Sequence, residues 1–165
     1  PNEKSFPNFT WNAMELYYPG NEYVDIIGLT GYNTGTYYKG ESWRSFDEIY
    51  GNMYQTYRNM FSQPLMITEF ACSGIGGDKA AWIADMFQQL HKYPDIKVAI
   101  WWNGCDWVVP GEVPARPYWV NETAQTLESF KQGWEAQTAA LKAKTEQANA
   151  AQETIGDGAT KEEVN

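Results

Sequence analysis

Short apolar segments alternate with segments of helical spacing along the chain, and this alternation limits the folds open to it. The apolar segments are residues 9–14, 23–33, 65–68 and 97–102. Apolar side chains recur at helical intervals over residues 45–61, 79–92 and 121–134. Strands that alternate with helices pair in parallel through right-handed crossovers. The sequence therefore predicts an α/β fold with a parallel sheet.

The third apolar segment, Leu65 to Thr68, leads directly into a carboxylate, Glu69. The segment is continuous rather than alternating, which is typical of a strand buried on both faces. A carboxylate beside such a strand is costly to bury without a partner, so Glu69 either reaches solvent or serves chemistry. In parallel sheets, functional residues collect at the carboxyl ends of the strands. The other strands end at Asn12, Tyr32, Asn33, Trp101 and Trp102, so the sequence predicts a site at that edge of the sheet.

Aromatic content and charge restrict the class of ligand. Aromatic residues make up 16% of the chain, and none lies beyond Trp134. An aromatic core accounts for part of this excess, and stacking platforms for the flat apolar faces of sugars account for the rest. The net charge of −9 disfavours nucleic acids and anionic membranes as partners. No stretch approaches the ~20 apolar residues that cross a bilayer. The chain opens at Pro1 without a visible signal peptide, and we expect it to be the interior of a longer protein.

The two cysteines, Cys72 and Cys105, are too few for a disulfide framework. Together with the single His91 they lack the spacing of a metal site. Each follows the end of a predicted strand and the two could be neighbours, but we expect two free thiols rather than a disulfide. The sequence predicts no metal and no cofactor.

Residues 135–165 differ in character from the rest, with many alanines and mixed charge. They are predicted to form a linker or tail that continues the last helix for a few turns and then frays at residues 156–158. The alternative is an amphipathic helix that binds a partner. Its apolar stripe is almost entirely Ala, which favours the tail.

Three motifs occur in one order along the chain: "YYPGNEYVDIIGLTGYN", "PLMITEFA" and "VAIWWNGCDW". Together they resemble the second half of glycoside hydrolase family 26, a family of (β/α)8 TIM barrels that includes endo-β-mannanases and some β-1,3-1,4-glucanases. The resemblance covers about residues 8–133, as barrel strands five to eight. It implies that residues 1–134 are the C-terminal half of a catalytic barrel and that residues 135–165 follow it as the tail.

The resemblance also implies roles for individual residues. Glu69 matches the catalytic nucleophile of a retaining mechanism, and Tyr32 matches the tyrosine that contacts it. Trp101 matches the sugar platform, with Trp102 as the second candidate. The further residues expected to bind substrate are Trp11, Asn12, Asn33 and Asp106.

Two departures from the family pattern shape the expectation. The family places its acid/base glutamate at the end of strand four, and we expect that carboxyl group to lie outside this chain. A complete barrel needs ~250 residues, and four parallel strands leave exposed edges and an open face. We therefore expect a fragment of a larger enzyme, a complementary half-barrel, or self-association.

The sequence-based hypothesis is a retaining endo-β-glycanase that hydrolyses β-mannan or β-1,3-1,4-glucan. A non-catalytic carbohydrate-binding half-barrel and an inactive structural fragment are the alternatives. Glu69 could instead cap the following loop or pair with an arginine, and one of Trp101 and Trp102 should belong to the core. Because polymeric glycans do not enter cells, the hypothesis implies a secreted or cell-surface protein.

Overall fold

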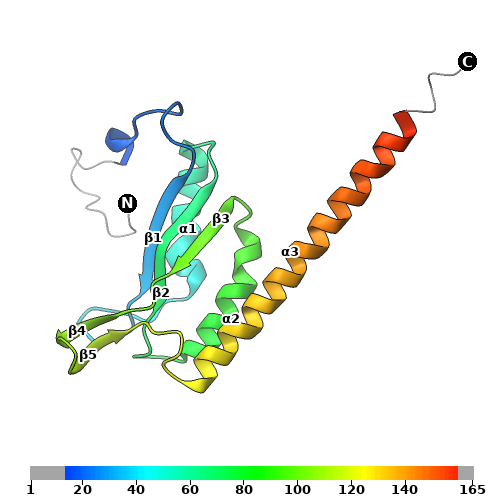
Figure 1. Cartoon of the computed structure of the whole chain (residues 1–165). Coiled ribbons are helices and arrows are strands. Elements are labelled where there is room, and N and C mark those ends of the chain that lie inside the picture. The colour runs from blue at the N-terminus through cyan, green and yellow to red at the C-terminus, as the bar shows by residue number, and fades with distance from the viewer. Residues whose placement is uncertain (1–13, 160–165) are drawn as a thin grey trace, which may run out of the picture.

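The computed structural model describes residues 14–159 and contains a three-stranded parallel sheet with helices on one of its faces (Figure 1). In chain order the elements are η2 (Met14–Tyr17), β1 (Ile27–Asn33), α1 (Phe46–Met60), β2 (Leu65–Cys72), α2 (Lys79–Gln89), η3 (Leu90–Lys92), β3 (Ile96–Trp101), β4 (Cys105–Val109), β5 (Val113–Pro117) and α3 (Ala124–Ala159). The predicted mixed α/β architecture is confirmed.

The sheet has the order β1-β2-β3, and both pairs of neighbouring strands are parallel. Three of the four predicted strands are therefore present, in chain order. The predicted strand at residues 9–14 lies outside the described residues except for Met14, which begins η2. Three parallel strands are compatible with a segment of an eight-stranded barrel, but the half-barrel itself stays a prediction.

The hydrophobic core lies between the sheet and helices α1 and α2. Burial alternates strictly along β1, where Ile27, Leu29, Gly31 and Asn33 are buried and the residues between them are half-buried. From the helices, the core receives Phe46, Ile49, Tyr50, Met53, Tyr54, Tyr57, Trp82, Ile83 and Met86. Because the two helices use one face of the sheet, the even-numbered side chains of β1 point to the opposite, open face.

The start of α1 was readable from the sequence. The Ser45 side chain accepts a hydrogen bond from the Glu48 N–H, and the Glu48 carboxylate accepts one from the Ser45 N–H. This reciprocal arrangement is a capping box. At α2, the Asp78 side chain accepts a hydrogen bond from the Ala81 N–H, so a capping side chain begins each of these two helices.

Strand β2 runs further than the sequence predicts. The prediction ended the strand at Thr68, but β2 continues to Cys72 and contains Glu69. Its register against β1 shifts, so that Leu29 pairs with Ile67 while Thr30 pairs with Glu69. The extra residue is Thr68, and the resulting bulge exposes both Thr68 and Glu69.

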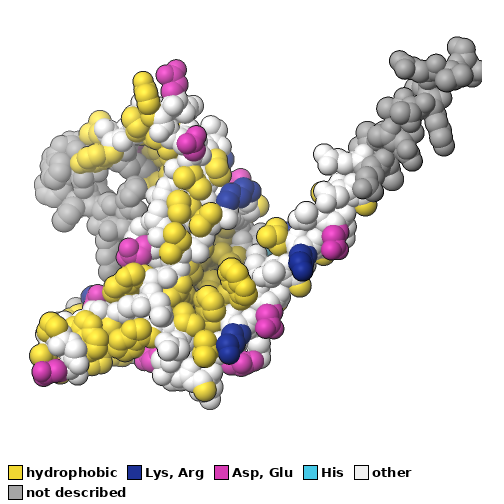
Figure 2. Space-filling model, viewed as in Figure 1, with side chains coloured by type: hydrophobic (Ala, Val, Ile, Leu, Met, Phe, Trp, Pro, Cys, Tyr) yellow, Lys and Arg dark blue, Asp and Glu magenta, His cyan; other side chains and the backbone are white. Residues whose placement is uncertain are grey.

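The segment after β3, for which the sequence predicts neither a strand nor a helix, forms a hairpin. Strands β4 and β5 pair antiparallel, and Gly111 in the turn between them has φ +78°, a backbone conformation that favours glycine. The hairpin has several exposed apolar side chains, namely Trp107, Val108, Val109 and Val113. Figure 2 shows hydrophobic atoms gathered over this hairpin and over the open face of the sheet, where Val98 and Ile100 are exposed.

Helix α3 is longer than predicted. It continues past Trp134 to Ala159, through residues 156–158, where fraying was predicted. Its first part packs on α2, and the rest projects away from the sheet (Figure 1). Ala, Lys, Glu and Gln dominate the projecting part, and their high helix propensity explains why the helix continues without packing. Within residues 14–159, none of the helices combines the length and apolarity needed to cross a membrane.

Candidate active site

Glu69 and Tyr32 meet at the open face of the sheet. The Tyr32 hydroxyl donates a short hydrogen bond to Glu69 Oε1. Glu69 is exposed and Tyr32 is half-buried, and the two residues come from the neighbouring strands β2 and β1. The structure thus brings together the two residues that the family resemblance assigns to the nucleophile and its tyrosine partner.

The bulge at Thr68 is what directs Glu69 to the open face. The Thr68 hydroxyl donates to the Leu29 carbonyl oxygen over 2.9 Å, and its oxygen lies 2.9 Å from the Thr30 hydroxyl. Gly28 leaves the space for Thr68, since a Cβ at Gly28 would lie 2.8 Å from Thr68 Cγ2. These contacts tie the bulge to β1 and hold the backbone beneath Glu69.

The environment of Tyr32 keeps its hydroxyl protonated. Burial, the hydrogen bond to Glu69 and the negative charge of Glu69 all raise the pKa of Tyr32 well above its usual value of 10. A phenol with so high a pKa remains a hydrogen-bond donor throughout the neutral range. Glu69 therefore has a permanent donor to one of its carboxylate oxygens.

Two further aromatic rings surround Tyr32. Its ring lies 5.1 Å from that of Tyr118 and 6.1 Å from that of Trp102, and the rings of Trp102 and Tyr118 are 5.4 Å apart. Tyr118 follows β5 and was not among the residues predicted to form the site. The only signal for it was its place in an aromatic pair, Tyr118-Trp119, within a segment interpreted as a loop.

The two tryptophans that end β3 lie on opposite sides of the sheet. The ring of Trp101 packs in the core against Phe70, Trp82 and Phe130, with centroid distances of 5.3, 6.2 and 5.9 Å. Trp102 instead lies beside Tyr32. The expectation that one of the pair belongs to the core is met, and it is Trp101, the first candidate for the platform. The geometry favours Trp102 for the sugar platform, which stays a prediction.

Asn33 does not face the site, contrary to its predicted role in substrate binding. Its side chain is fully buried. The Asn33 Oδ1 accepts hydrogen bonds from the N–H groups of Gly35 and Arg44, and its Nδ2 donates to Cys72 Sγ. These contacts fix the loop after β1, because the residue belongs to the helix-facing side of the alternating strand.

Asp106 lies in an ion-pair cluster beside the site. Arg116 Nη1 donates to Asp106 Oδ2 over 2.8 Å, and Arg116 also pairs with Glu41. Burial alone would raise the pKa of Glu41, but hydrogen bonds from Arg116 and the Tyr38 N–H outweigh it and lower that pKa. The Asp106 carboxylate is 42% exposed and contributes to the raised pKa of Tyr32, which places its charge near the site. The candidates Trp11 and Asn12 lie outside the described residues.

The cysteines and carboxylates form no metal centre within residues 14–159, since no cluster of three or more metal-binding side chains is present there. Cys72 and Cys105 are free thiols. Burial raises the pKa of the Cys72 thiol far above its usual value, so it is not a reactive thiolate.

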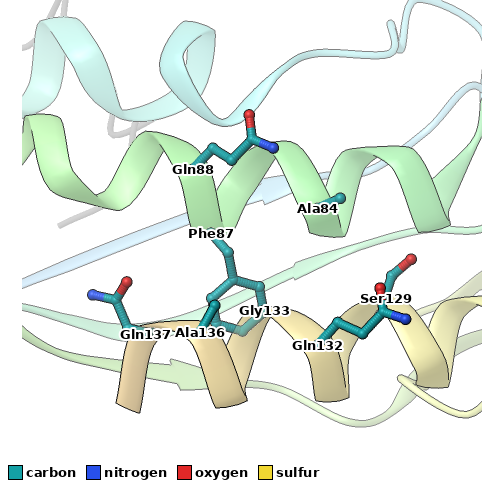
Figure 3. Close-up of a pocket in the computed structure, with 8 residues that line it drawn as sticks. All are labelled: Ala84, Phe87, Gln88, Ser129, Gln132, Gly133, Ala136 and Gln137. Atoms are coloured by element: carbon teal, nitrogen blue, oxygen red, sulfur yellow. The ribbon is translucent and has the colours of Figure 1, made fainter. Parts of the chain in front are cut away.

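A pocket between α2 and α3 lies on the helical side of the sheet, away from Glu69 (Figure 3). It is lined by Ala84, Phe87, Gln88, Ser129, Gln132, Gly133, Ala136 and Gln137. None of these side chains is titratable, so the pocket offers no acid, base or charged nucleophile.

Two comparisons with known proteins match parts of this chain, including the strands that carry Tyr32 and Glu69. Residues 5–71 match the family model described as glycosyl hydrolase family 26, a stretch that includes both Tyr32 and Glu69. The chain is also 37% identical over 89 residues to Endoglucanase H of Acetivibrio thermocellus. That match covers 53% of this chain and 10% of the relative, so the chain corresponds to about a tenth of the relative's length.

The matched segment is therefore similar to glycosyl hydrolases. Within that class, the resemblance to family 26 that the three motifs predict is confirmed over residues 5–71.

Proposed function

We propose that this chain supplies the nucleophile of a retaining endo-β-glycanase, with Glu69 as the nucleophile. The observation that supports the proposal best is the hydrogen bond from the Tyr32 hydroxyl to Glu69 Oε1. It joins an exposed carboxylate to a donor at the open face of the sheet, beside the ring of Trp102. A carboxylate that attacks sugar must be accessible and oriented, and both conditions are met here.

In the proposed mechanism, a Glu69 oxygen forms a bond to the anomeric carbon as the bond from that carbon to the leaving oxygen breaks. The leaving oxygen takes a proton from a second carboxyl group, the acid/base. Water then attacks the anomeric carbon of the glycosyl-enzyme and loses a proton to the same acid/base. The bond from that carbon to Glu69 breaks, and the sugar leaves with its anomeric configuration retained. The hydrogen bond from Tyr32 fixes which Glu69 oxygen points toward the sugar.

The acid/base is proposed to lie outside this chain. A retaining mechanism needs the two carboxyl groups ~5–5.5 Å apart. Asp106 and Glu41 are acidic residues whose charges raise the pKa of Tyr118. Both form ion pairs with Arg116. The lowered pKa of Glu41 makes it a poor proton donor, and the Asp106 carboxylate is engaged in its pair with Arg116. The exposed Val98 and Ile100 on the open face support the further proposal that other strands complete the barrel there.

The proposed substrate is a β-linked polysaccharide, either a β-glucan or a β-mannan. The name of the matched relative, an endoglucanase, favours the glucan. The half-buried rings of Trp102 and Tyr32 supply the apolar surface on which a sugar ring can stack, and the buried ring of Tyr118 packs against both. A polymeric substrate of this kind implies a secreted or cell-surface location.

The decisive experiment is covalent labelling with 2-deoxy-2-fluoro glycosides that carry a dinitrophenolate leaving group, in gluco and manno forms. Such a leaving group departs without acid help, so the chain can be tested as it stands. We expect one added sugar by intact mass, located at Glu69 by peptide mapping. Glu69→Gln should abolish the label, while Glu112→Gln, in the turn of the hairpin, should leave it unchanged.

A label at any residue other than Glu69, or no label from either reagent, would contradict the proposal. In the second case, measured affinity for a β-glycan that falls in Trp102→Ala would indicate a carbohydrate-binding protein instead. The reagent that labels faster identifies the sugar that the site prefers.

A further inference from the structure

Lys79 is a buried cation in an unfavourable place. Its residue is 4% exposed, and it occupies the first position of α2, directly after the capping residue Asp78. Burying an ammonium group is costly, and a positive charge at a helix N-terminus opposes the helix dipole. Lys79 therefore does not stabilise α2, and its role lies in the groups that it binds.

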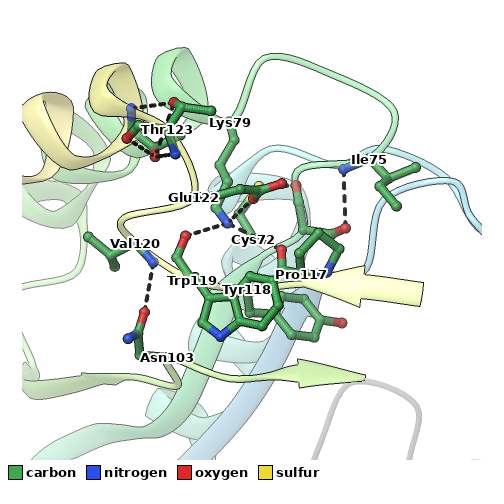
Figure 4. Close-up of polar contacts among 12 residues, drawn as sticks. Cys72, Ile75, Lys79, Asn103, Pro117, Tyr118, Trp119, Val120, Glu122 and Thr123 are labelled. Carbon is green, nitrogen blue, oxygen red and sulfur yellow. Dashed lines mark hydrogen bonds and ion pairs between the residues drawn. The ribbon is translucent and has the colours of Figure 1, made fainter. Parts of the chain in front are cut away.

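The ammonium group of Lys79 binds the chain on both sides of Tyr118 (Figure 4). Lys79 Nζ donates to the carbonyl oxygen of Pro117 over 3.2 Å and to that of Trp119 over 2.8 Å. Its third contact is the carboxylate of Glu122, at 2.7 Å. All three donors of the ammonium group are thus used on one short segment, residues 117–122.

The backbone of Tyr118 itself is fixed as well. Its N–H donates to the Gly104 carbonyl oxygen over 2.9 Å, and its carbonyl oxygen accepts from Trp101 Nε1 over 2.8 Å. Asn103 Oδ1 accepts from the Val120 N–H over 2.7 Å (Figure 4). The segment is therefore attached to the end of β3 as well as to Lys79.

The same clamp reaches the end of β2, the strand that contains Glu69. The Gly74 N–H donates to the Pro117 carbonyl oxygen over 3.1 Å, beside the bond from Lys79. A Cβ at Gly74 would collide with the Glu122 carboxylate, so a larger residue at this position would displace that carboxylate. Lys79, Glu122 and Gly74 form one connected contact at the base of the Tyr118 segment.

We propose that Lys79 is a positioning residue for the active site, because it fixes the segment whose Tyr118 ring packs on Tyr32 and Trp102. By this route it holds the Tyr32 hydroxyl on Glu69 and the Trp102 ring in its place. The catalytic part of the inference rests on the proposed function, whereas the placement of Tyr118 does not.

The test compares Lys79→Met with the unsubstituted chain, with Lys92→Met as the matched control. Lys92 also pairs with a carboxylate, Asp47, but at 3.8 Å and with half of its side chain exposed. Hydrogen–deuterium exchange followed by mass spectrometry reports the backbone amides of residues 118–122, since Pro117 has no N–H. We expect these amides to exchange at least tenfold faster in Lys79→Met and at the unsubstituted rate in Lys92→Met.

The second readout is the kinetics of labelling at Glu69. In Lys79→Met the inactivation rate constant should fall about tenfold or more, because a displaced Tyr32 no longer orients the carboxylate. The dissociation constant of the reagent should change less than the rate constant. A change of overall stability alone would leave both constants of the folded fraction unchanged.

Lys79→Met leaves Glu122 without its partner and risks misfolding, so Glu122→Gln is tested in parallel. This variant keeps Lys79 and weakens only one of its three contacts, and we expect the amides of residues 118–122 to exchange faster here too. Unchanged exchange in a folded Lys79→Met or Glu122→Gln would overturn the inference. If the unsubstituted chain takes no label, the proposed function fails, and exchange still decides the role of Lys79.

Discussion

The hydroxyl of Tyr32 is the one donor that the structure gives to the Glu69 carboxylate within residues 14–159. Two features of the structure keep the Tyr32 hydroxyl available as a donor to Glu69. The bulge at Thr68 exposes Glu69 beside β1, and burial raises the pKa of Tyr32 so that the phenol stays protonated. The activity proposed for the site therefore depends on two atoms, the hydroxyl oxygen of Tyr32 and Glu69 Oε1.

Replacing Tyr32 by Phe tests the importance of this hydrogen bond. A hydrogen bond to a charged group contributes about 1.5–3 kcal/mol, so Tyr32→Phe should slow labelling at Glu69 by roughly 10- to 100-fold. The rate is measured by intact mass against time. Tyr23→Phe is the matched control, since Tyr23 is 75% exposed, and it should label at the unsubstituted rate. Equal rates in the two variants would mean that Tyr32 does not orient the carboxylate.

The adjacent tryptophans should respond in opposite ways to substitution. Trp101→Ala removes a ring packed on Phe70, Trp82 and Phe130 and should lower the free energy of unfolding by about 3 kcal/mol. Trp102→Ala should instead weaken binding of a β-glycan oligosaccharide roughly fivefold, through loss of about 1 kcal/mol of stacking. Urea unfolding and titration calorimetry measure the two effects. The reverse pattern would place the platform at Trp101.

At the scale of elements, the packing of α3 on α2 depends on a glycine. A Cβ at Gly133 would collide with the ring of Phe87, which also packs edge-on with Phe130 at a centroid distance of 5.5 Å. Both residues line the pocket shown in Figure 3. Glycine is a poor helix former, so its presence inside α3 indicates a steric requirement.

Gly133→Ala should therefore destabilise the protein although alanine is the better helix former. The gain in helix propensity is about 1 kcal/mol, and overpacking costs about 1–3 kcal/mol, so we expect a net loss near 1 kcal/mol. The melting temperature by circular dichroism measures it. Adding Phe87→Ala removes the collision, and Gly133→Ala should then be stabilising in that background. A higher melting temperature for Gly133→Ala alone would show that the two helices are not in this contact.

Most elements could be predicted from sequence, and the failures have physical causes. Helices α1 and α2 were found because their apolar side chains recur at helical spacing and Ser45 and Glu48 form a capping box. The hairpin of β4 and β5 was missed, because its apolar side chains are largely exposed and β5 contains two prolines, Pro114 and Pro117. The length of α3 was missed because propensity, rather than an apolar stripe, extends it.

The whole molecule contains several buried phenols whose pKa values govern its behaviour at high pH. Burial and then the charge of Glu15 raise the pKa of Tyr57 to about 12. Burial likewise raises the pKa of Tyr118 and Tyr93 above 10, with Asp106 and Asp47, respectively, adding to the effect. In the unfolded chain these groups lose their protons near pH 10. Above that pH the unfolded state binds fewer protons than the folded state, so stability falls as pH rises.

We therefore expect the melting temperature to be steady at neutral pH and to fall progressively above about pH 10. A second, acidic loss should come from Glu41, whose lowered pKa gives stability that is present above pH 4.5 and lost as pH falls. Thermal melts across a pH series measure both. Tyr57→Phe should reduce the alkaline loss, and a melting temperature unchanged up to pH 11.5 would contradict the prediction.

Local pattern determined the secondary-structure segments, the class of fold, the family resemblance over residues 5–71 and the choice of Glu69 and Tyr32 as candidates. These features could be predicted because periodicity and motifs are properties of residues that are neighbours in the sequence. The tertiary structure alone decided that Asn33 is buried, that Trp102 rather than Trp101 lies beside Tyr32, that Tyr118 packs on Tyr32, and that Lys79 binds the chain next to Tyr118. The physical reason is that a register shift reassigns side chains between faces, and contacts between distant segments form only when the sheet pairs.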